Sequence, residues 1–248
     1  MKELKLSDVQ NYVNENIGTF HQNRVARLQQ VKLKEVLRKK NPYLFRAKNI
    51  LTAERLVESI LDAFLSSSEE ELFGNFLEGL AIFVASKTVN GTKSAATGID
   101  LEFDKNGVKY LVAIKSGQNW GNSSQWLALR ANFKKAVRVL RQSKQVKHVQ
   151  PVVGSCYGRM KTVDDGQLIR MAGQSFWHFL SGNEKLYTEI IEPIGFQAKR
   201  HNDKYFEERA ALVNRFTSEF ASEFCTNGRI DWEKLVIFNS GNLGKSSQ

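Results

Sequence analysis

Between residues 98 and 115, apolar and polar positions alternate in two short runs, and this pattern predicts a β-hairpin. Asp104–Gly107 separates the runs, and its Asn-Gly pair is a strong signal for a tight hairpin turn. Asp100 and Glu102 are predicted to share one face of the first strand. The opposite face is predicted to hold its apolar residues, Ile99, Leu101 and Phe103. Lys115 ends the second strand, so the hairpin is expected to bring carboxylates and an amine together.

The region before the hairpin has apolar residues at helical spacing. Residues 7–40 combine a ragged apolar stripe with many lysines and arginines, and they are expected to form one or two helices that end before Pro42. Their basic side chains favour a contact with a nucleic-acid backbone or a dimer arm, and a solvated helix face is the alternative.

A further helix is predicted over residues 52–64, with Thr52 as its N-cap. The capping-box pattern Ser68-x-x-Glu71 then predicts that a new helix begins there and ends near residue 87. Glu78 lies inside an apolar run of this helix. Because a buried, unpaired carboxylate is costly, Glu78 is expected to have a partner such as a lysine or a metal ion. An exposed position at the helix edge is the alternative.

The loop after Lys115 is rich in amide, hydroxyl and glycine residues and leads into another predicted helix, which Ser123 or Ser124 is expected to cap. Amides and hydroxyls can donate hydrogen bonds to phosphate oxygens or read base edges. A helix cap preceded by a turn is the alternative. The candidate nucleic-acid contacts are Asn119, Asn122, Ser123, Ser124 and Gln125.

The helix after this loop carries the densest basic strip of the chain. It consists of Lys134, Lys135, Arg138, Arg141, Lys144 and Lys147. The whole chain has a formal net charge of +10 and a pI of about 9.6. A basic protein with clustered charge is attracted to polyanions, and Lys134, Lys135 and Arg138 are the first candidates for phosphate contacts.

The composition is that of an ordinary globular protein, with 42% apolar and 25% charged residues in 248. The sequence has no apolar run near 18 residues and no secretion signal at its start, so a cytoplasmic protein without a membrane span is expected. Its two cysteines and four histidines have no zinc spacing and no arrangement for covalent catalysis.

The hairpin sequence resembles a known nuclease signature. Asp100, followed thirteen residues later by Ala113-Ile114-Lys115, resembles the PD-(D/E)XK motif. The longer run from Lys115 to Gln125, KSGQNWGNSSQ, is more specific and resembles one group of type II restriction endonucleases. The resemblance covers residues 68–160. Ala113 departs from the motif, because it stands where the second acid usually lies and alanine cannot hold a metal ion.

The resemblance implies a Mg²⁺ site for phosphodiester hydrolysis. In that arrangement Asp100 binds the metal, the backbone carbonyl of Ile114 is a second ligand, and Lys115 orients or helps to deprotonate the attacking water. Three explanations fit the missing acid. Glu78 supplies a carboxylate from the preceding helix, Glu102 supplies one from the strand, or the protein has lost a ligand and binds DNA while cutting it poorly.

The expected fold is α/β, a restriction-endonuclease-like mixed β-sheet core flanked by helices, with helical N- and C-terminal additions. Residues 1–66 are expected to form a helical region for DNA contact or dimerisation, and residues 67–160 the nuclease core. Residues 161–248 are expected to be a helical region that packs on the core within the same domain.

The resemblance implies a type II restriction endonuclease that cleaves double-stranded DNA at a specific short sequence with Mg²⁺. A homodimer is expected because a two-fold protein reads a palindromic site, and a cognate DNA methyltransferase is expected as genetic partner. The alternatives are a DNA-binding protein on a nuclease scaffold with weak or no cleavage, and a repair or recombination nuclease.

Overall fold

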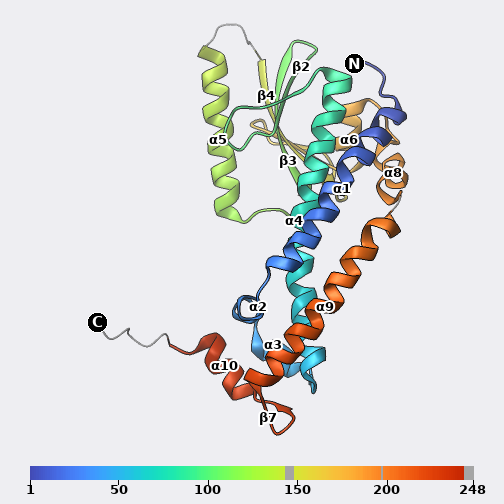
Figure 1. Cartoon of the computed structure of the whole chain (residues 1–248). Helices are drawn as coiled ribbons and strands as arrows, with labels where there is room; N and C mark the ends of the chain where they lie inside the picture. The colour runs from blue at the N-terminus through green and yellow to red at the C-terminus, as the bar shows by residue number, and fades with distance from the viewer. Residues whose placement is uncertain (143–147, 197, 243–248) are drawn as a thin grey trace. The chain divides into compact units, whose positions relative to one another are not determined.

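A computed structural model describes residues 1–142, 148–196 and 198–242, without the side chains of residues 198–200. The chain forms two compact units, which can be traced by sequence colour in Figure 1. The first unit contains residues 1–18 and 73–196, and the second contains residues 19–72 and the described part of residues 197–248. Two long helices, α1 (Leu6–Gln30) and α4 (Ala53–Val89), each contribute residues to both units.

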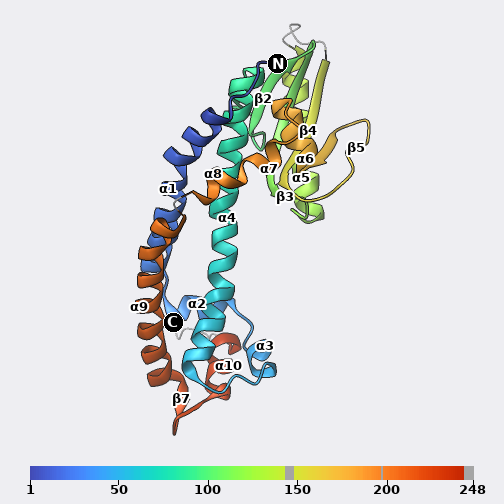
Figure 2. The ribbon, with the colours of Figure 1, turned by 90° about the vertical axis from the view of Figure 1, so that its right-hand side faces the viewer.

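A mixed sheet of six strands within the described residues forms the centre of the first unit. Its strands are β1 (Thr92–Lys93), β2 (Leu101–Lys105), β3 (Val108–Gly117), β4 (His148–Tyr157), β5 (Val163–Asp164) and β6 (Ile169–Ala172). They lie in the order β1-β2-β3-β4-β6-β5, so β2 and β5 lie towards opposite edges (Figure 2). The pairs β2–β3 and β5–β6 are antiparallel, whereas β4 runs parallel to both β3 and β6. The predicted α/β fold with a mixed sheet is therefore confirmed.

The predicted hairpin turn is also confirmed. Lys105 pairs with Val108, which leaves Asn106 and Gly107 as a two-residue loop. Both loop residues have positive φ angles, of 52° and 77°. Asparagine and glycine tolerate this conformation best, so their sequence fixes the register of β2 against β3.

Helices cover both faces of this sheet (Figure 1). On one face, α5 (Ser123–Gln142) buries Leu129 and Phe133 against apolar residues of β3 and β4. On the other face lie α6 (Gln174–Ser181) and the part of α4 that belongs to the first unit. The indole N–H of Trp177 in α6 donates a 2.8 Å hydrogen bond to the carbonyl of Cys156 in β4. Two short helices, α7 (Leu186–Glu189) and α8 (Ile191–Gly195), follow α6.

The face assignment of the first hairpin strand is corrected by this packing. Ile99 belongs to the apolar cluster under α5, whereas Leu101 approaches Gly91 and Ala85 on the opposite side of the sheet. Strict alternation fails because regular β2 begins only at Leu101, after a segment in which Gly98 has a φ of +73°. Residues 99 and 101 therefore do not share one regular strand.

The predicted start of a new helix at Ser68 is wrong, because α4 is continuous from Ala53 to Val89. Thr52 does cap this helix, and its hydroxyl accepts a hydrogen bond from the N–H of Arg55. In the middle of the helix, the hydroxyl of Ser67 donates to the carbonyl of Ala63, four residues earlier. A serine that bonds back to the preceding turn is compatible with a continuous helix, so the serine-rich stretch does not interrupt it.

The C-terminal region differs from the expected helical addition in two ways. It begins with β5 and β6, which join the sheet of the first unit. After residue 197 the chain forms α9 (Ala198–Phe224), whose apolar residues pack in the second unit. The boundary between units therefore does not fall at residues 66 and 160, because residues 163–196 complete the sheet and α9 completes a different core.

The second unit is built almost entirely from helices. Besides parts of α1, α4 and α9, it contains α2 (Leu33–Lys39), α3 (Pro42–Ala47), α10 (Trp232–Ser240) and the short pair β7 (Cys225–Thr226) and β8 (Arg229–Ile230). Its core joins leucine and valine side chains of α1, α2 and α4 to Phe45 of α3 and to the phenylalanines of α9. The helices expected over residues 7–40 correspond to α1 and α2.

A polar cluster lies beside this core. The guanidinium of Arg24 donates hydrogen bonds to Glu69 at 2.9 Å and to Asn202 at 2.6 Å, and it stacks 3.7 Å from the ring centre of Tyr205. Its Nη1 atom lies 3.4 Å from Nδ1 of His21. The His21 ring is 8% exposed and stacks on the ring of His201 with a centroid distance of 4.8 Å.

By length and composition alone, α4 is long and apolar enough to cross a membrane. One such helix is weak support for a span, because the core helix of a soluble protein passes the same test. Here Leu56 and Leu61 pack in the core of the second unit, and Leu80 and Val84 are buried in the first. The apolar residues of α4 thus have packing partners within the protein.

Candidate active site

Asp100 and Lys115 come from adjacent segments of the hairpin and lie close together. The backbone N–H of Asp100 donates a 2.9 Å hydrogen bond to the carbonyl of Val112, which fixes Asp100 beside β3. The Oδ2 atom of Asp100 lies 3.9 Å from Nζ of Lys115. The two side chains are 21% and 24% exposed, so both groups can be reached from solvent. The predicted acid and amine are therefore brought together at one accessible point.

Ile114 contributes backbone groups to the same point. Its N–H donates a 2.6 Å hydrogen bond to Oδ2 of Asp100. In an antiparallel pair, the N–H and C=O of one residue point to the same side of the strand. The carbonyl oxygen of Ile114 therefore faces the edge of β3 at which Asp100 lies.

Glu78 reaches the pair from α4. Burial raises the pKa of Glu78 above its ordinary value, and the negative charge of Asp100 raises it further. The positive charges of Lys93 and Lys115 act in the opposite direction. Glu78 is thus within electrostatic reach of both hairpin residues. A cation bound between Glu78 and Asp100 would offset the repulsion that raises the pKa of Glu78.

Glu102 has different surroundings. Its Oε2 accepts a 3.3 Å hydrogen bond from the hydroxyl of Ser94. It also lines a cavity of about 410 Å³ together with Leu111 and Lys135 on the α5 side of the sheet. The charges that act on Glu78 are those of Asp100, Lys93 and Lys115, and Glu102 is not among them. This geometry favours Glu78 over Glu102 as the companion of Asp100.

The packing around Ala113 accounts for the absence of an acid there. Its side chain is fully buried in the apolar cluster beneath α5, where Leu129 and Phe133 are also buried. A carboxylate at this position would be placed among apolar groups unless the packing changed. Burying an ionised carboxylate without a partner is strongly unfavourable.

The donor set fits a hard divalent cation better than a structural metal. Within the part of the chain that the structure describes, no group of three or more His, Cys, Asp or Glu side chains is arranged to hold a metal ion. Mg²⁺ typically retains several waters and binds one or two carboxylates together with substrate phosphates. Asp100, Glu78 and the carbonyl of Ile114 meet that requirement, whereas a structural zinc site needs four nitrogen or sulfur ligands.

Aromatic side chains that sequence analysis did not assign to the site surround Lys115. Its Nζ lies 4.9 Å from the ring centre of Trp120, which in turn contacts Trp126 at 4.9 Å. The guanidinium of Arg170 lies 5.7 Å from the ring centre of Trp126. Trp120 falls within the run that carries the family resemblance, so a signal for it was present. Arg170 lies in the four-residue β6, which is too short to give a periodic signal.

The loop before α5 is organised as a reciprocal helix cap. The side-chain oxygen of Asn122 accepts from the N–H of Gln125 at 3.1 Å, and the side chain of Gln125 accepts from the N–H of Asn122 at 2.9 Å. The cap is therefore Asn122, and the predicted caps Ser123 and Ser124 are corrected. The hydroxyl of Ser124 instead donates to Asn122. These residues and Asn119 are exposed beside the site.

The basic strip on α5 divides between two cavities. Lys134, Arg138 and Arg141 line a cavity of about 570 Å³ between α5 and the β5–β6 turn. Lys135 lines the smaller cavity that contains Glu102. Lys144 and Lys147, which were predicted to extend the strip, lie outside the described residues.

A mixed sheet flanked by helices, with an acid and a lysine at adjacent strand segments, is the arrangement of a PD-(D/E)XK nuclease. Comparison with known proteins agrees with this class. The family model described as "Type II restriction endonuclease EcoO109I" matches residues 7–202. The chain belongs to this family of type II restriction endonucleases. No curated protein matches the chain.

The family match extends the resemblance on both sides of residues 68–160 and includes α1 and the whole sheet. The predicted recognition of the chain as a type II restriction endonuclease is confirmed. Family membership makes the protein a nuclease whose substrate is DNA. Members of this family generally use divalent metal ions and are typically soluble.

Proposed function

We propose that this nuclease is a Mg²⁺-dependent restriction enzyme that hydrolyses double-stranded DNA at a specific short sequence. The observation that carries the proposal is the approach of Asp100 to Lys115 at an accessible point, with Glu78 within electrostatic range. An acidic pair attracts the cation, and the adjacent amine favours the phosphate. Neither group alone would bind both.

The residues that would hold Mg²⁺ are Asp100, Glu78 and the carbonyl of Ile114. When bound, the ion lowers the pKa of a coordinated water and neutralises charge on the phosphate. Asp100 connects Ile114 to Lys115, because its Oδ2 accepts a hydrogen bond from the N–H of Ile114 and lies 3.9 Å from Nζ of Lys115. The ammonium group of Lys115 can donate hydrogen bonds to a phosphate oxygen or to the attacking water. No covalent intermediate is needed.

Glu78 is our choice for the second acid, in place of Glu102. A carboxylate supplied from α4 can compensate for Ala113 without placing charge in the apolar layer under α5. Because its pKa is raised, Glu78 gives up its proton at a higher pH than an ordinary glutamate, and a cation binds the ionised form. Metal affinity is therefore expected to rise with pH in the range where Glu78 ionises.

We further propose that the exposed cap residues contact DNA next to the cleavage point. Asn122, Ser124 and Gln125 follow directly on the strand that carries Lys115, and Asn119 and Ser123 are exposed with them. Amides that face a base pair can recognise it through two hydrogen bonds. A homodimer that reads a palindromic sequence, with a cognate methyltransferase that protects the host DNA, completes the proposal.

Ala113 supports a second candidate function, a DNA-binding protein on the nuclease scaffold that cuts weakly or not at all. An alanine at this position removes one carboxylate from the usual ligand set. The two functions differ in whether the remaining groups are sufficient for hydrolysis. A cleavage experiment therefore separates them.

The test is digestion of a long plasmid with Mg²⁺, using Asp100→Ala and Lys115→Ala as variants. Discrete bands are expected for the wild-type protein, with cleavage abolished and binding of the same DNA largely retained in both variants. Asp104 and Lys109 provide a matched control, because they form a 3.0 Å ion pair on the same two strands. Alanine at either control position should leave the bands unchanged.

Three results would contradict the proposal. Unchanged cleavage in Asp100→Ala or Lys115→Ala would remove these residues from catalysis. A gel shift without any cutting by the wild-type protein would favour the binding protein. A smear in place of bands would indicate a nuclease without sequence specificity.

A further inference from the structure

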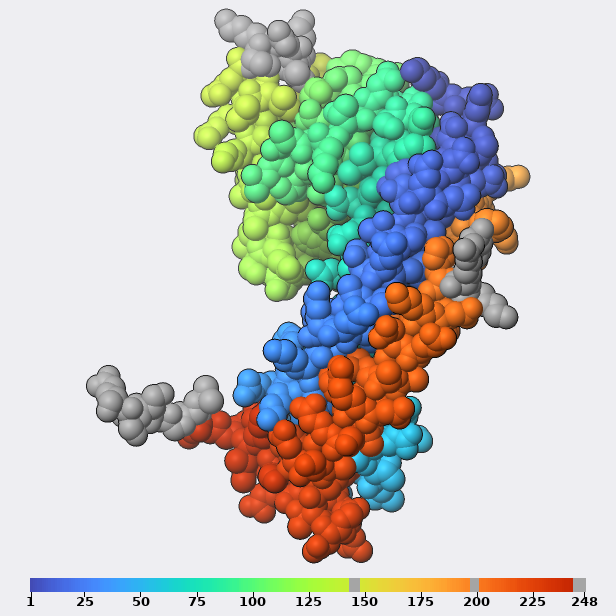
Figure 3. Space-filling model, viewed as in Figure 1, coloured from blue at the N-terminus to red at the C-terminus, as the bar shows by residue number. Residues whose placement is uncertain are grey.

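A basic groove lies on the surface of the first unit, formed by α5 and the turn between β5 and β6. Its volume is about 570 Å³. Phe133, Val137 and Leu168 contribute apolar groups to its lining, and the cations come from α5. The helix lies at the surface of this unit, where it appears in yellow-green in Figure 3. The groove cations are Arg130, Lys134, Arg138 and Arg141.

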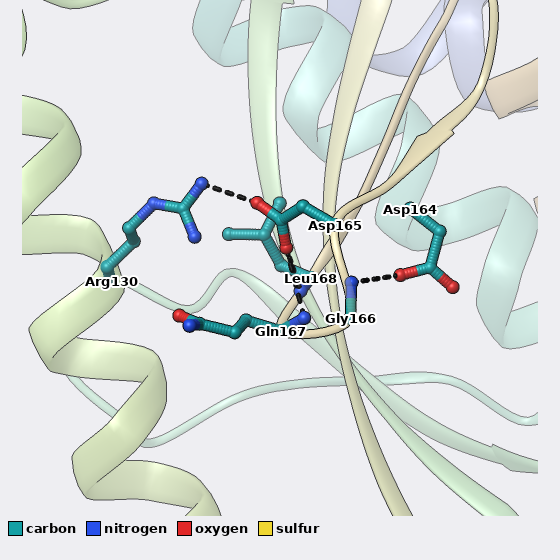
Figure 4. Close-up of polar contacts among 6 residues, drawn as sticks. All are labelled: Arg130, Asp164, Asp165, Gly166, Gln167 and Leu168. Carbon is teal, nitrogen blue, oxygen red and sulfur yellow. Dashed lines mark hydrogen bonds and ion pairs between the residues drawn. The ribbon is translucent and has the colours of Figure 1, made fainter.

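The turn that forms the far wall is held rigidly (Figure 4). Asp165 accepts a 2.6 Å hydrogen bond from the guanidinium of Arg130 and further bonds from the N–H groups of Gln167 and Leu168. Asp164 accepts another from the N–H of Gly166. The Arg130 guanidinium and the two backbone N–H groups lower the pKa of Asp165 to about 2. Its carboxylate is thus ionised and already paired.

The remaining cations of the groove have no such partner. Among the residues that the structure describes, Lys134, Arg138 and Arg141 form no ion pair, and all three are exposed. Asp165 forms no ion pair with them, because its Oδ2 accepts from Arg130 and its Oδ1 accepts from the N–H groups of Gln167 and Leu168. The groove therefore has unbalanced positive charge next to a rigid wall.

The spacing of these cations suits a nucleic-acid backbone. Lys134, Arg138 and Arg141 recur every three or four residues on one side of α5, so they form a line about 10 Å long at 1.5 Å per residue. A DNA strand advances about 3.4 Å per phosphate, so such a line spans roughly three nucleotides. The first turn of α5 lies close to the cleavage residues, because Trp126 contacts Trp120 and this indole contacts Lys115.

We propose that this groove binds the sugar-phosphate backbone of duplex DNA outside the cleavage centre, independently of base sequence. The inference rests on the proposed function in one respect, the identity of the polyanion as DNA. Lys134 and Arg138 make phosphate contacts, and Arg130 with Asp165 positions the wall of the groove. Lys135 makes none, because it faces the separate cavity that contains Glu102.

Lys134 and Lys135 provide a matched pair for the test. They are adjacent, exposed and equally charged, but consecutive residues of a helix point about 100° apart, and they line different cavities. Replacing either with glutamine changes the net charge of the protein equally. Any difference between the two variants therefore reports a local contact rather than long-range attraction.

The experiment measures binding of a fluorescent 40-base-pair duplex of mixed sequence, in EDTA, at several salt concentrations between about 50 and 200 mM. For Lys134→Gln and Arg138→Gln, the slope of log affinity against log salt should become shallower by about 0.9, as for one lost phosphate contact. The slope for Lys135→Gln should equal that of the wild-type protein. Equal slopes in all four proteins would overturn the proposal, as would the absence of any binding.

Two further measurements identify the cause of a negative result. Sedimentation of Lys134→Gln should match that of the wild-type protein; a change in oligomeric state would overturn the proposal and make the groove an interface between copies of the chain. The plasmid digestion tests the proposed function separately. If the plasmid is cleaved but the salt slopes are equal, only the groove proposal is refuted. If the slopes are unequal but nothing is cleaved, only the nuclease proposal is refuted.

Discussion

His21 is held uncharged in the polar cluster of the second unit, so mild acid is expected to destabilise the folded protein. Burial lowers the pKa of His21 from 6.5 to about 4; His201 and Arg24 add to this effect, and Glu69 opposes it. Because the folded state has the lower pKa, its stabilisation is complete above pH 6.5 and is lost as the pH falls towards 4. At about 1.4 kcal/mol per pKa unit, the loss is on the order of 3 kcal/mol.

The assay is urea unfolding, followed by the circular dichroism of the helices, at several pH values between 7.5 and 4. His21→Gln removes the titrating ring while keeping a polar side chain beside Arg24. The free energy of unfolding should fall with pH more steeply in the wild-type protein than in this variant, by roughly 3 kcal/mol over the range. His148→Gln, at an exposed histidine, should behave like the wild-type protein. Parallel curves for the wild-type protein and His21→Gln would refute the reasoning.

Three other predictions concern the site and its support. Glu78→Gln should lower Mg²⁺-dependent cleavage by at least tenfold and raise the Mg²⁺ concentration required, whereas Glu102→Gln should do neither; the reverse order in a metal titration would exchange their roles. Trp120→Leu should reduce kcat by roughly fivefold with little change in KM, because the cation–π contact that holds Lys115 is worth about 1 kcal/mol. Trp120→Phe should restore most of that rate, and equal rates for the two variants would argue against a positioning role. Gly154→Ala should destabilise the protein by about 2 kcal/mol in urea unfolding, because its methyl group would collide with the fully buried ring of Phe176; an unchanged unfolding midpoint would contradict this packing.

The parts of the fold that the sequence predicts well depend on local chemistry. Asn106 and Gly107 specify a turn by their backbone conformation, and this turn fixes the register that carries Asp100 to Lys115. The approach of these two groups follows from local pairing and needs no knowledge of the rest of the chain. The helix α5 is likewise predicted by the helical spacing of its apolar residues.

The features that sequence analysis missed depend on tertiary packing. Ile99 and Leu101 lie on opposite faces because the regular strand begins only at Leu101, and alternation assumes a regular strand. The strands β5 and β6 are too short, at two and four residues, to produce a periodic pattern. Capping chemistry at Ser68 is a local preference that the continuous packing of α4 overrides.

The choice between acids was likewise beyond local rules. Glu78 and Glu102 are equally plausible by composition, and only the packing of α4 and α5 around the sheet distinguishes their surroundings. Tertiary packing also distinguishes Lys134 from Lys135, because these two neighbours on α5 line different cavities. Distances between segments far apart in sequence decide these cases.

The burial of Ala113 has a consequence for finding and engineering related enzymes. Reinstating glutamate at this strand position would introduce charge into an apolar layer, so the expected product is a less stable protein rather than a more active one. A motif search that demands an acid two positions before the lysine would pass over this chain altogether. Searches that also accept a carboxylate from the preceding helix, the role proposed for Glu78, would recover such chains.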